Sequence, residues 1–270
     1  RNTPQWFIAL DKPTANGKTL RENALAAIDA TEFTPPRGRT RIRSMVEDRP
    51  DWLISRQRAW GVPITIFVHK ETGDVLVDEA VNKRITDAIT AGGADAWFET
   101  ASQDFLGSEY KADDYEKVED ILDVWFDSGS THAFCLEERE DLKWPADVYC
   151  EGSDQHRGWF QSSLLEACGT RGRAPYEHVV TNGFVVDGDG RKMSKSLGNV
   201  MAPEEGIKQY GAEIVRIWVA SSDYTEDLRI SKEIIGSSVD AYRRLRNTLR
   251  YLLGALNGFS DAERLDAKDM

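Results

Sequence analysis

Cysteine, histidine and long apolar runs are scarce in this sequence of 270 residues. Its three cysteines, Cys135, Cys150 and Cys168, lie far apart and form no C-x-x-C pair. This usage fits free buried thiols in a reducing compartment and provides no zinc site. The four histidines show no ligand spacing, so they suggest no other metal site. No apolar run approaches the roughly 20 residues that span a bilayer, and no signal peptide is visible. We therefore expect a cytoplasmic protein that does not bind a membrane.

Acidic residues outnumber basic ones by 46 to 34, which gives a formal net charge of −12. An acidic total argues against unspecific coating of nucleic acid. Basic clusters remain at residues 37–43 and 243–246; such clusters are more often solvated faces, and RNA contact stays open. Forty per cent of the residues are hydrophobic, enough for a sizeable core in one large domain or two small ones.

Apolar periodicity divides the first half of the chain into short elements. Residues 6–10 predict a short strand, residues 34–38 predict a loop because they contain Pro-Pro and Gly, and residues 64–68 predict a strand. Between the strand at 6–10 and the loop at 34–38, four apolar residues recur at helical spacing: Leu20, Ala24, Ala27 and Ile28. Residues 69–118 are charged and punctuated by glycine, with a helical stretch around 80–91. This composition is typical of an insertion between two pieces of a core.

A strand and a helix flank a polar turn in the second half of the chain. Residues 146–150 predict the strand, residues 151–158 form the turn, and a helix is expected from there to about Cys168. Together they make half of a βαβ unit, and open α/β sheets bind ligands at such carboxyl ends. Further short strands are expected at 179–180 and 184–186.

Two helices are expected after this region. The first begins at Pro203 and places four large side chains on one face: Ile207, Tyr210, Ile214 and Trp218. The second covers 232–257, and apolar side chains recur along it at seven-residue steps: Ile235, Tyr242, Leu249 and Leu256. Such a stripe is most simply a face of a helix bundle. We expect its partner helices beyond residue 270.

The clearest chemical signal is a stretch that we call the lysine loop, residues 188–199. Lys192 and Lys195 can point the same way on a turn and grip one polyanion as two point charges. Gly190 and Gly198 on either side allow positive φ angles and let the loop move. Two mobile cations suit a transition state that gains negative charge on phosphate oxygens. A solvated basic loop is the alternative, and it fits most isolated K-x-x-K pairs.

The polar turn carries a second group of candidate residues, Glu151, Asp154 and Gln155. Carboxylates at this place can accept hydrogen bonds from ribose hydroxyls or from an ammonium group. Metal ligation and capping of the following helix are alternatives, and no second acidic cluster supports Mg²⁺. Trp125 and Trp159 can wall a small apolar pocket beside these groups, although core packing is the commoner use of tryptophan.

Residues 187–190, Asp-Gly-Asp-Gly, have the look of a calcium loop. An EF-hand needs Glu at its twelfth position, and here that position is Gly198. A hairpin turn before the lysine loop is therefore the better prediction.

Four stretches resemble the isoleucyl-tRNA synthetase family of the class I aminoacyl-tRNA synthetases. Residues 192–199, Lys-Met-Ser-Lys-Ser followed by Leu-Gly-Asn, resemble the second class I signature. Residues 52–61 resemble its Ser-Arg-Gln-Arg-x-Trp-Gly segment, and residues 123–130 resemble its Asp-Val-Trp-Phe-Asp-Ser-Gly block. Residues 151–160 resemble the block Glu-Gly-x-Asp-Gln-x-Arg-Gly-Trp-Phe, which the valyl and leucyl relatives do not share. This last block therefore carries the choice of amino acid, and the resemblance covers nearly the whole chain.

The resemblance implies an α/β fold, namely the second half of a class I Rossmann-type catalytic domain with an inserted subdomain. A mostly helical stem-contact region and the start of an α-helical anticodon-binding bundle follow. The implied boundaries are a catalytic segment at 1–65 after a missing editing insertion, the inserted subdomain at 66–118, the second catalytic half at 119–200, the stem-contact region at 201–231 and the bundle at 232–270.

The resemblance also implies a reaction. The carboxylate of isoleucine attacks the α-phosphate of ATP, which enters with Mg²⁺, and the isoleucyl-adenylate then charges tRNA(Ile). Lys192 and Lys195 are the implied catalytic residues and bind the β- and γ-phosphates, and the implied ATP site also includes Ser194, Ser196 and Asn182. The implied full-length enzyme is a monomer of the protein-synthesis machinery.

The family's adenylate-binding residues fall on the polar turn and on the two tryptophans. Glu151, Gly152 and Asp154 hold the adenylate, chiefly through its ribose. Gln155 helps to fix the amino group of isoleucine. The remaining pair, Trp125 and Trp159, flank the isoleucine side chain.

The sequence departs from the family pattern in two places. Asn182-Gly183 stands where the family often has His-Gly, which puts one adenine or phosphate contact in doubt. The first class I signature, His-x-Gly-His, is missing from these 270 residues, so we expect that they do not activate isoleucine alone. Two other functions remain open: a non-catalytic module that binds nucleotide or tRNA, and another adenylyl transferase of the same fold, which would lack the helix at 232–257.

Overall fold

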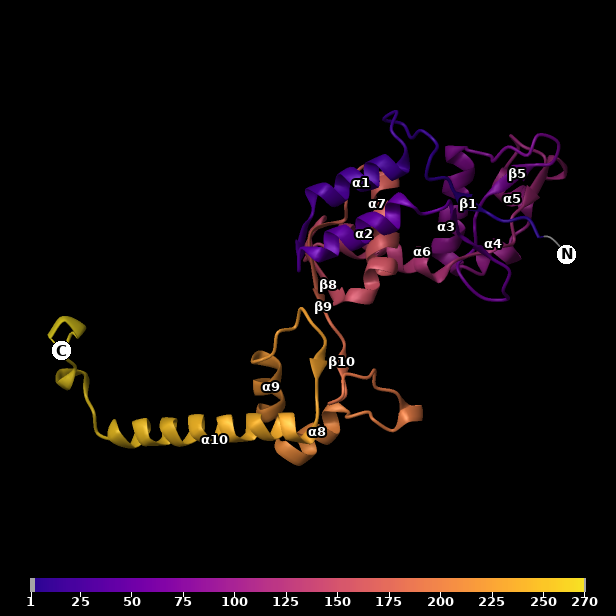
Figure 1. The fold of residues 1–270 in the computed structure, drawn as a ribbon. Helices are drawn as coiled ribbons and strands as arrows, with labels where there is room; N and C mark the ends of the chain where they lie inside the picture. The colour runs from indigo at the N-terminus through magenta and orange to yellow at the C-terminus, as the bar shows by residue number, and fades with distance from the viewer. Residues whose placement is uncertain (1–2, 270) are drawn as a thin grey trace. The chain divides into compact units, whose positions relative to one another are not determined.

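The computed structural model of the chain describes residues 3–269, and side chains up to residue 268 (Figure 1). The chain forms two compact units, Arg1–Val180 and Thr181–Met270. Among the helices of the described residues, none is long and apolar enough to cross a membrane.

A small sheet and three helices form the core of the first unit. The strands are β2 (Glu32–Thr34), β9 (Tyr176–Asn182) and β8 (Ala146–Gly152), in the order β2-β9-β8. β2 runs parallel to β9, with Phe33 opposite Val179, although the two strands lie far apart in the sequence. The helices are α1 (Leu20–Ala30), α2 (Arg37–Glu47) and α7 (Trp159–Arg171). Parallel strands joined through helices are the arrangement of α/β folds.

Helix α1 forms where its sequence provides both a cap and an apolar face. The hydroxyl of Thr19 accepts from the amide of Glu22 at 3.1 Å, and the Glu22 carboxylate accepts from the amide of Thr19 at 2.7 Å. This reciprocal pair satisfies two amides that a helix N-terminus leaves unbonded. The residues buried along the helix are Leu20, Ala24 and Ile28. The helix expected from their spacing is confirmed.

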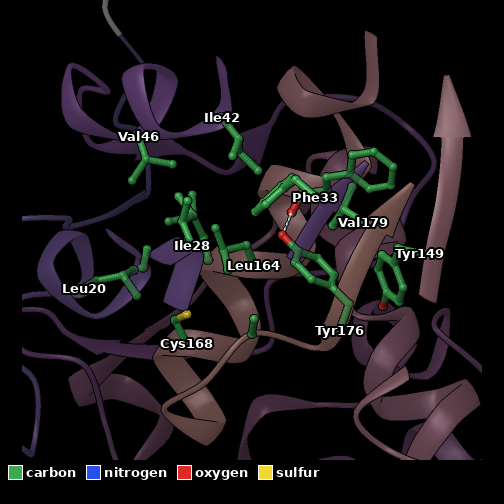
Figure 2. Packing of buried hydrophobic residues seen from close by; sticks show 14 of the residues in the cluster. Leu20, Ile28, Phe33, Ile42, Val46, Tyr149, Leu164, Cys168, Tyr176 and Val179 are labelled. Carbon is green, nitrogen blue, oxygen red and sulfur yellow. Dashed lines mark hydrogen bonds between the residues drawn. The ribbon is translucent and has the colours of Figure 1, made fainter. Parts of the chain in front are cut away.

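Helix α7 is buried along most of its length and lies at the centre of the unit. Residues 160–168 are buried without interruption, so this stretch has no solvent face, whereas residues 169–171 at the end of the helix are exposed. The Tyr176 hydroxyl of β9 donates to the Phe160 carbonyl at 3.1 Å, and Leu164 packs among the side chains of β2, β9 and α2 (Figure 2). Gly172, in the left-handed conformation, ends the helix. The strand, turn and helix expected from residue 146 onward are confirmed, and the helix extends three residues past Cys168.

Helix α2 corrects one prediction, because it begins at Arg37 inside the stretch expected to be a loop at 34–38. Its buried face is narrow and consists of Gly38, Ile42 and Val46. A Cβ atom at residue 38 would lie 2.9 Å from Nε2 of His156, so a glycine allows the close approach. The apolar signal of this helix is weak because basic residues dominate its sequence, and the basic cluster at 37–43 lies along it.

The segment between Phe67 and Lys117 has its own hydrophobic core. It contains an antiparallel pair of strands, β5 (Phe67–His69) and β6 (Tyr115–Lys117), the helices α3 (Glu79–Gly92), α4 (Ala96–Glu99) and α5 (Ser102–Leu106), and the 3-10 turn η1 (Ala112–Asp114). Its buried residues are Phe67, Val81, Ile85, Trp97, Phe105 and Leu106. The Trp97 indole donates to the Val118 carbonyl at 2.8 Å, which attaches this core to the chain that leaves it. The helix expected around 80–91 is confirmed.

Short strands and turns connect this segment to the sheet. They are β1 (Phe7–Ile8) paired with β3 (Trp52–Leu53), β4 (Ser55–Arg56) paired with β7 (Ile121–Leu122), helix α6 (Val124–Gly129), the π-helical turn η2 (His132–Glu137) and the 3-10 turn η3 (Ser153–Arg157). The strand expected at 6–10 is therefore only two residues long. The strand expected at 64–68 is shifted, because pairing with β6 begins at Phe67.

The second unit is mostly helical. Its elements are β10 (Val185–Val186) parallel to β11 (Leu228–Arg229), helices α8 (Pro203–Tyr210), α9 (Ala212–Ala220) and α10 (Lys232–Ala255), and the 3-10 turns η4 (Lys195–Leu197), η5 (Asp261–Glu263) and η6 (Ala267–Asp269). Ile214 and Trp218 of α9 pack against Ile235 of α10. The long helix is confirmed to within two residues. Its apolar stripe is buried only near its start, since Leu249 and Leu256 are exposed.

The prediction of a single helix after Pro203 is wrong. Gly211 has a φ of +95° and separates α8 from α9. This conformation is unfavourable for any residue except glycine and cannot belong to a right-handed helix. Apolar spacing continued across the break, so the side-chain pattern alone did not reveal it.

A matched pair of glycine substitutions tests the close packing of α6 on α7. A Cβ atom at Gly129 would lie 2.0 Å from the Glu166 carboxylate and 3.0 Å from the backbone of Ser162. We expect Gly129→Ala to lower the free energy of unfolding by about 1–3 kcal/mol, because the backbone of α7 cannot move aside. Gly169 lies in α7, and a Cβ atom there would be 3.7 Å from its nearest neighbour. Gly169→Ala should therefore be neutral or stabilising by up to about 1 kcal/mol. Urea unfolding measures both, and equal effects would contradict this account.

Candidate functional site

The polar turn expected to bind a ligand lies between β8 and α7. The Gln155 side chain spans it: its amide oxygen accepts from the backbone N–H of Trp159 at 3.0 Å, and its amide nitrogen donates to Asp154 at 3.1 Å. Gln155 therefore caps α7, and the alternative in which Glu151 or Asp154 caps this helix is wrong. Glu151 is exposed, and among the described residues its carboxylate bonds only the backbone N–H of Gly152. Both carboxylates keep acceptor capacity for a ligand.

Gly158 brings two of the predicted site residues together. A Cβ atom at this position would lie 2.4 Å from Oε1 of Gln155 and 2.9 Å from the ring of Trp125. Without a side chain at residue 158, the Gln155 amide and the Trp125 ring can both rest against the same backbone. Trp125 remains 44% exposed, so one part of its ring is open to a ligand.

Trp159 is held more firmly than Trp125. Its ring stacks on Tyr149, with centroids 4.1 Å apart and an interplanar angle of 7°, and its indole N–H donates to the Ser128 carbonyl at 3.0 Å. Ser128 belongs to α6, which also carries Trp125. One short helix thus carries one tryptophan and binds the other, which fixes the indole of Trp159 against the core.

A cavity of about 290 Å³ opens beside Trp125 and Gly158. Its lining includes residues that the sequence analysis did not select: Arg49, Arg56, Asp123 and Gln161. The Arg49 guanidinium donates to the amide oxygen of Gln161 and lies 5.6 Å from the Trp52 ring centroid. Arg56 donates to Asp123, whose other oxygen caps α6 by accepting from Trp125 N at 2.9 Å. The sequence signal that was available is the Arg49-Pro-Asp-Trp segment. The partners of Arg49 and Arg56, however, lie more than sixty positions away in the chain.

Burial changes the charge state of groups around α7. Burial and, to a lesser extent, the nearby Asp127 carboxylate together raise the pKa of Glu166 to about 9, so this carboxyl is neutral at pH 7. Burial also lowers the pKa of His156, whose Nδ1 lies 2.7 Å from the Ser153 carbonyl. Among the described residues, no group of three or more His, Cys, Asp or Glu side chains gathers as metal ligands do.

The lysine loop lies in the second unit and begins with a hairpin. Val186 and Lys192 pair as an antiparallel bridge, and the amide of Gly190 donates to the Asp187 carbonyl at 2.9 Å. Gly190 has a φ of +82°, which such a turn requires and glycine allows. The hairpin expected at 187–190 is confirmed.

The loop presents both lysines to solvent. Lys192 and Lys195 are exposed, and within residues 3–269 neither ammonium group has an ion pair or a hydrogen bond. The Ser194 hydroxyl accepts from the Leu197 amide at 3.3 Å and lies 3.1 Å from the Ser196 hydroxyl. This contact starts the 3-10 turn that carries Lys195. Two cations without partners, on an ordered turn, are suited to bind an anion.

Asn182 lies at the end of β9. Its side chain is exposed, and its amide nitrogen donates to the Gly183 carbonyl at 2.9 Å. The amide oxygen remains available as an acceptor, and the second N–H remains available as a donor.

Comparison with known proteins places this geometry in a family. Residues 1–231 match the family model described as tRNA synthetases class I (I, L, M and V). The isoleucine–tRNA ligase of Zymomonas mobilis is 61% identical over 274 residues, which cover 100% of this chain and 29% of that protein. The isoleucine–tRNA ligase of Pelagibacter ubique is 60% identical over 270 residues, again 100% and 29%. The chain thus spans about 29% of the length of these curated relatives.

Solved structures agree on the fold. A leucyl-tRNA synthetase of Agrobacterium radiobacter K84, in a ternary complex with tRNA and LeuAMS, matches with a TM-score of 0.53 and 21% identity and covers 81% of this chain and 30% of its own. Methionyl-tRNA synthetase of Mycobacterium tuberculosis, bound by methionyl-adenylate, matches with a TM-score of 0.52 and 20% identity and covers 82% of this chain and 35% of its own. The α/β class I catalytic fold expected from the resemblance is confirmed. The chain belongs to the class I tRNA synthetase family that includes the isoleucyl, leucyl, methionyl and valyl enzymes.

Proposed function

We propose that this chain is part of an isoleucine–tRNA ligase, which activates isoleucine with ATP and transfers it to tRNA(Ile). The observation that carries the proposal is the convergence of Gln155 and Trp125 on Gly158, next to the fixed ring of Trp159. An amide at the mouth of a pocket with aromatic walls suits an amino acid with an apolar side chain. Both relatives described above align along the whole chain and carry the name of this ligase.

The polar turn supports binding of the aminoacyl-adenylate. Glu151 and Asp154 offer carboxylate oxygens to the ribose hydroxyls, and Gln155 offers its amide to the amino group of isoleucine. A Cβ atom at Gly152 would lie 2.7 Å from Asp154 Oδ1, so a side chain there would displace this carboxylate. In this proposal Trp125 and Trp159 flank the isoleucine side chain.

The lysine loop supports binding of ATP, which would enter as its Mg²⁺ complex. Lys192 and Lys195 bind the β- and γ-phosphates, and three polar residues supply further contacts: Ser194, Ser196 and Asn182. The carboxylate of isoleucine attacks the α-phosphate, the bond to the bridging oxygen breaks, and pyrophosphate leaves. The cations stabilise the negative charge that develops on the leaving phosphates.

The division of the chain is part of the same proposal. The catalytic pieces are residues 1–65 and 119–200, with an inserted subdomain at 66–118 whose separate core supports this boundary. Residues 201–231 then form the stem-contact region, and 232–270 begin the anticodon-binding bundle. We place the full-length enzyme in the cytoplasm as a monomer.

Removal of one loop cation tests the catalytic role. In the full-length enzyme, we expect Lys195→Ala to slow isoleucyl-adenylate formation about 10²–10³-fold with little change in isoleucine binding, because one preorganised charge contact to the transition state is lost. Pyrophosphate exchange measures the rate. Lys208→Ala removes an exposed lysine of α8 and serves as the control, with an unchanged rate. An unchanged turnover number for Lys195→Ala would remove the loop from the reaction and favour a non-catalytic binding module.

A methyl group at Gly158 tests the isoleucine pocket. Gly158→Ala forces the Gln155 amide and the Trp125 ring apart, and we expect the KM for isoleucine to rise about 5–150-fold, the equivalent of a packing cost of about 1–3 kcal/mol. The KM for ATP should change less than about twofold, because the lysine loop is untouched. Gly169→Ala, near the end of α7, is the control. If Gly158→Ala raised only the KM for ATP, these residues would not form the amino-acid pocket.

A further inference from the structure

Two side chains close the base of the lysine loop. The amide nitrogen of Asn199 donates to Oδ2 of Asp187 at 2.9 Å, so the residue that precedes the loop is joined to its last residue. Asp187 follows β10 directly, and its side chain points into this junction, with the residue only 8% exposed. We refer to this contact as the loop clamp.

Asp187 is saturated with hydrogen bonds. Oδ1 accepts from the amides of Asp189 at 3.0 Å and Arg191 at 2.8 Å, and Oδ2 accepts from Arg191 Nε at 3.0 Å as well as from Asn199. These donors, above all the Asn199 amide, lower the pKa of Asp187 to about 2. The carboxylate is therefore ionised at neutral pH and holds the turn in one shape.

Asn199 connects this carboxylate to the backbone between the lysines. Its amide oxygen accepts from Ser194 N at 2.9 Å, and its amide nitrogen also donates to the Lys192 carbonyl at 3.3 Å. The backbone on both sides of Met193 is thereby fixed. Since the Ser194 hydroxyl starts the 3-10 turn of Lys195, the same amide also sets where that turn begins.

The clamp leaves the loop's positive charge available. Arg191 binds both acidic side chains of the hairpin, because Nε bonds Asp187 and Nη2 bonds Asp189 at 2.8 Å. Its single positive charge offsets one of the two negative charges, while Lys192 and Lys195 stay exposed. A fixed backbone that carries unpaired cations is preorganised for an anion, and such a site spends little free energy on rearrangement when charge develops.

We propose that Asp187 and Asn199 are positioning residues of the lysine loop, which set the directions of Lys192 and Lys195 without touching substrate. The inference rests on the proposed function for its effect on rate, but the clamp itself is testable without any substrate. Three variants separate its parts: Asn199→Ala removes the connection, Asn199→Asp replaces the donor by a second carboxylate, and the double variant Asp187→Asn with Asn199→Asp restores a hydrogen bond of reversed polarity.

Hydrogen exchange of the full-length protein without ligands reports on the clamp itself. We expect Asn199→Ala to speed exchange of the Ser194 amide about tenfold, the effect of losing one hydrogen bond of ordinary net strength. Asp189→Asn is the matched control, since it changes a carboxylate of the same hairpin that does not contact Asn199. Unchanged protection of Ser194 in Asn199→Ala would overturn the clamp.

Pyrophosphate exchange then reports on positioning. We expect Asn199→Ala to lower kcat about 10–100-fold, because small misplacements of catalytic groups cost rates of this order, while the KM for isoleucine changes less than about twofold. Asn199→Asp should be worse, since it places two carboxylates in contact, and the double variant should regain at least about fivefold over Asn199→Asp. The control Asp189→Asn should keep the wild-type rate.

Two results would overturn the positioning role. One is a loosened loop with unchanged kcat, and the other is a double variant no better than Asn199→Asp. Lys195→Ala distinguishes these results from a failure of the proposed function. If Lys195→Ala itself leaves the rate of pyrophosphate exchange unchanged, the loop has no part in the reaction. If Lys195→Ala lowers that rate while Asn199→Ala does not, only the positioning role of the clamp is rejected.

Discussion

Burial of residues 160–168 in helix α7 is the constraint on which the first unit depends. A helix with nine consecutive buried residues must be packed on every side, so α1, α2, α6 and the sheet all take their places against it. Its first turn therefore cannot shift without moving the core. Gly158, where Gln155 and Trp125 meet, lies just before that turn. The candidate amino-acid pocket is thus positioned by the same apolar contacts that stabilise the fold, which act over a large area and tolerate little displacement.

This core also contains buried polar side chains, whose burial is unfavourable for stability. Gln161 is only 2% exposed and binds Arg49, which itself lies over an aromatic ring. Glu166 is buried as a neutral acid, because ionisation without a partner in an apolar site is unfavourable. A core built for stability alone would not contain these groups. Gln161 lines the cavity beside the candidate site, and Glu166 adjoins α6 at Gly129.

The lysine loop is stabilised in a different way. Side-chain-to-backbone hydrogen bonds from Asp187 and Asn199 hold it, and its exposed residues contribute little apolar burial. Each such bond contributes about 0.5–1.5 kcal/mol net, so the loop is ordered without being part of a core. This suits the proposed role of the segment, in which two cations stay in water until an anionic ligand binds.

Local signals were sufficient for the elements whose own sequence encodes them. The apolar spacing of α1, the helical stretch at 80–91, the strand-turn-helix at 146–168 and the length of α10 were all predicted, because each depends on residues within one or two turns. Helix α2 and the break at Gly211 were not. The first buries a face formed partly by a glycine, and the second depends on a backbone angle that leaves the side-chain pattern unchanged.

The sequence by itself determined which residues are candidates for the chemistry: the lysine pair, the polar turn and the two tryptophans stand in contiguous blocks that could be recognised without a structure. Only the tertiary structure decided how they are held. The pairing of Arg49 with Gln161, the approach of Trp125 to Gly158 and the closing of the lysine loop by Asp187 and Asn199 join residues that are separated in the chain. No periodicity reports such contacts, because they arise from packing and hydrogen bonding between elements rather than from the conformation of any one element.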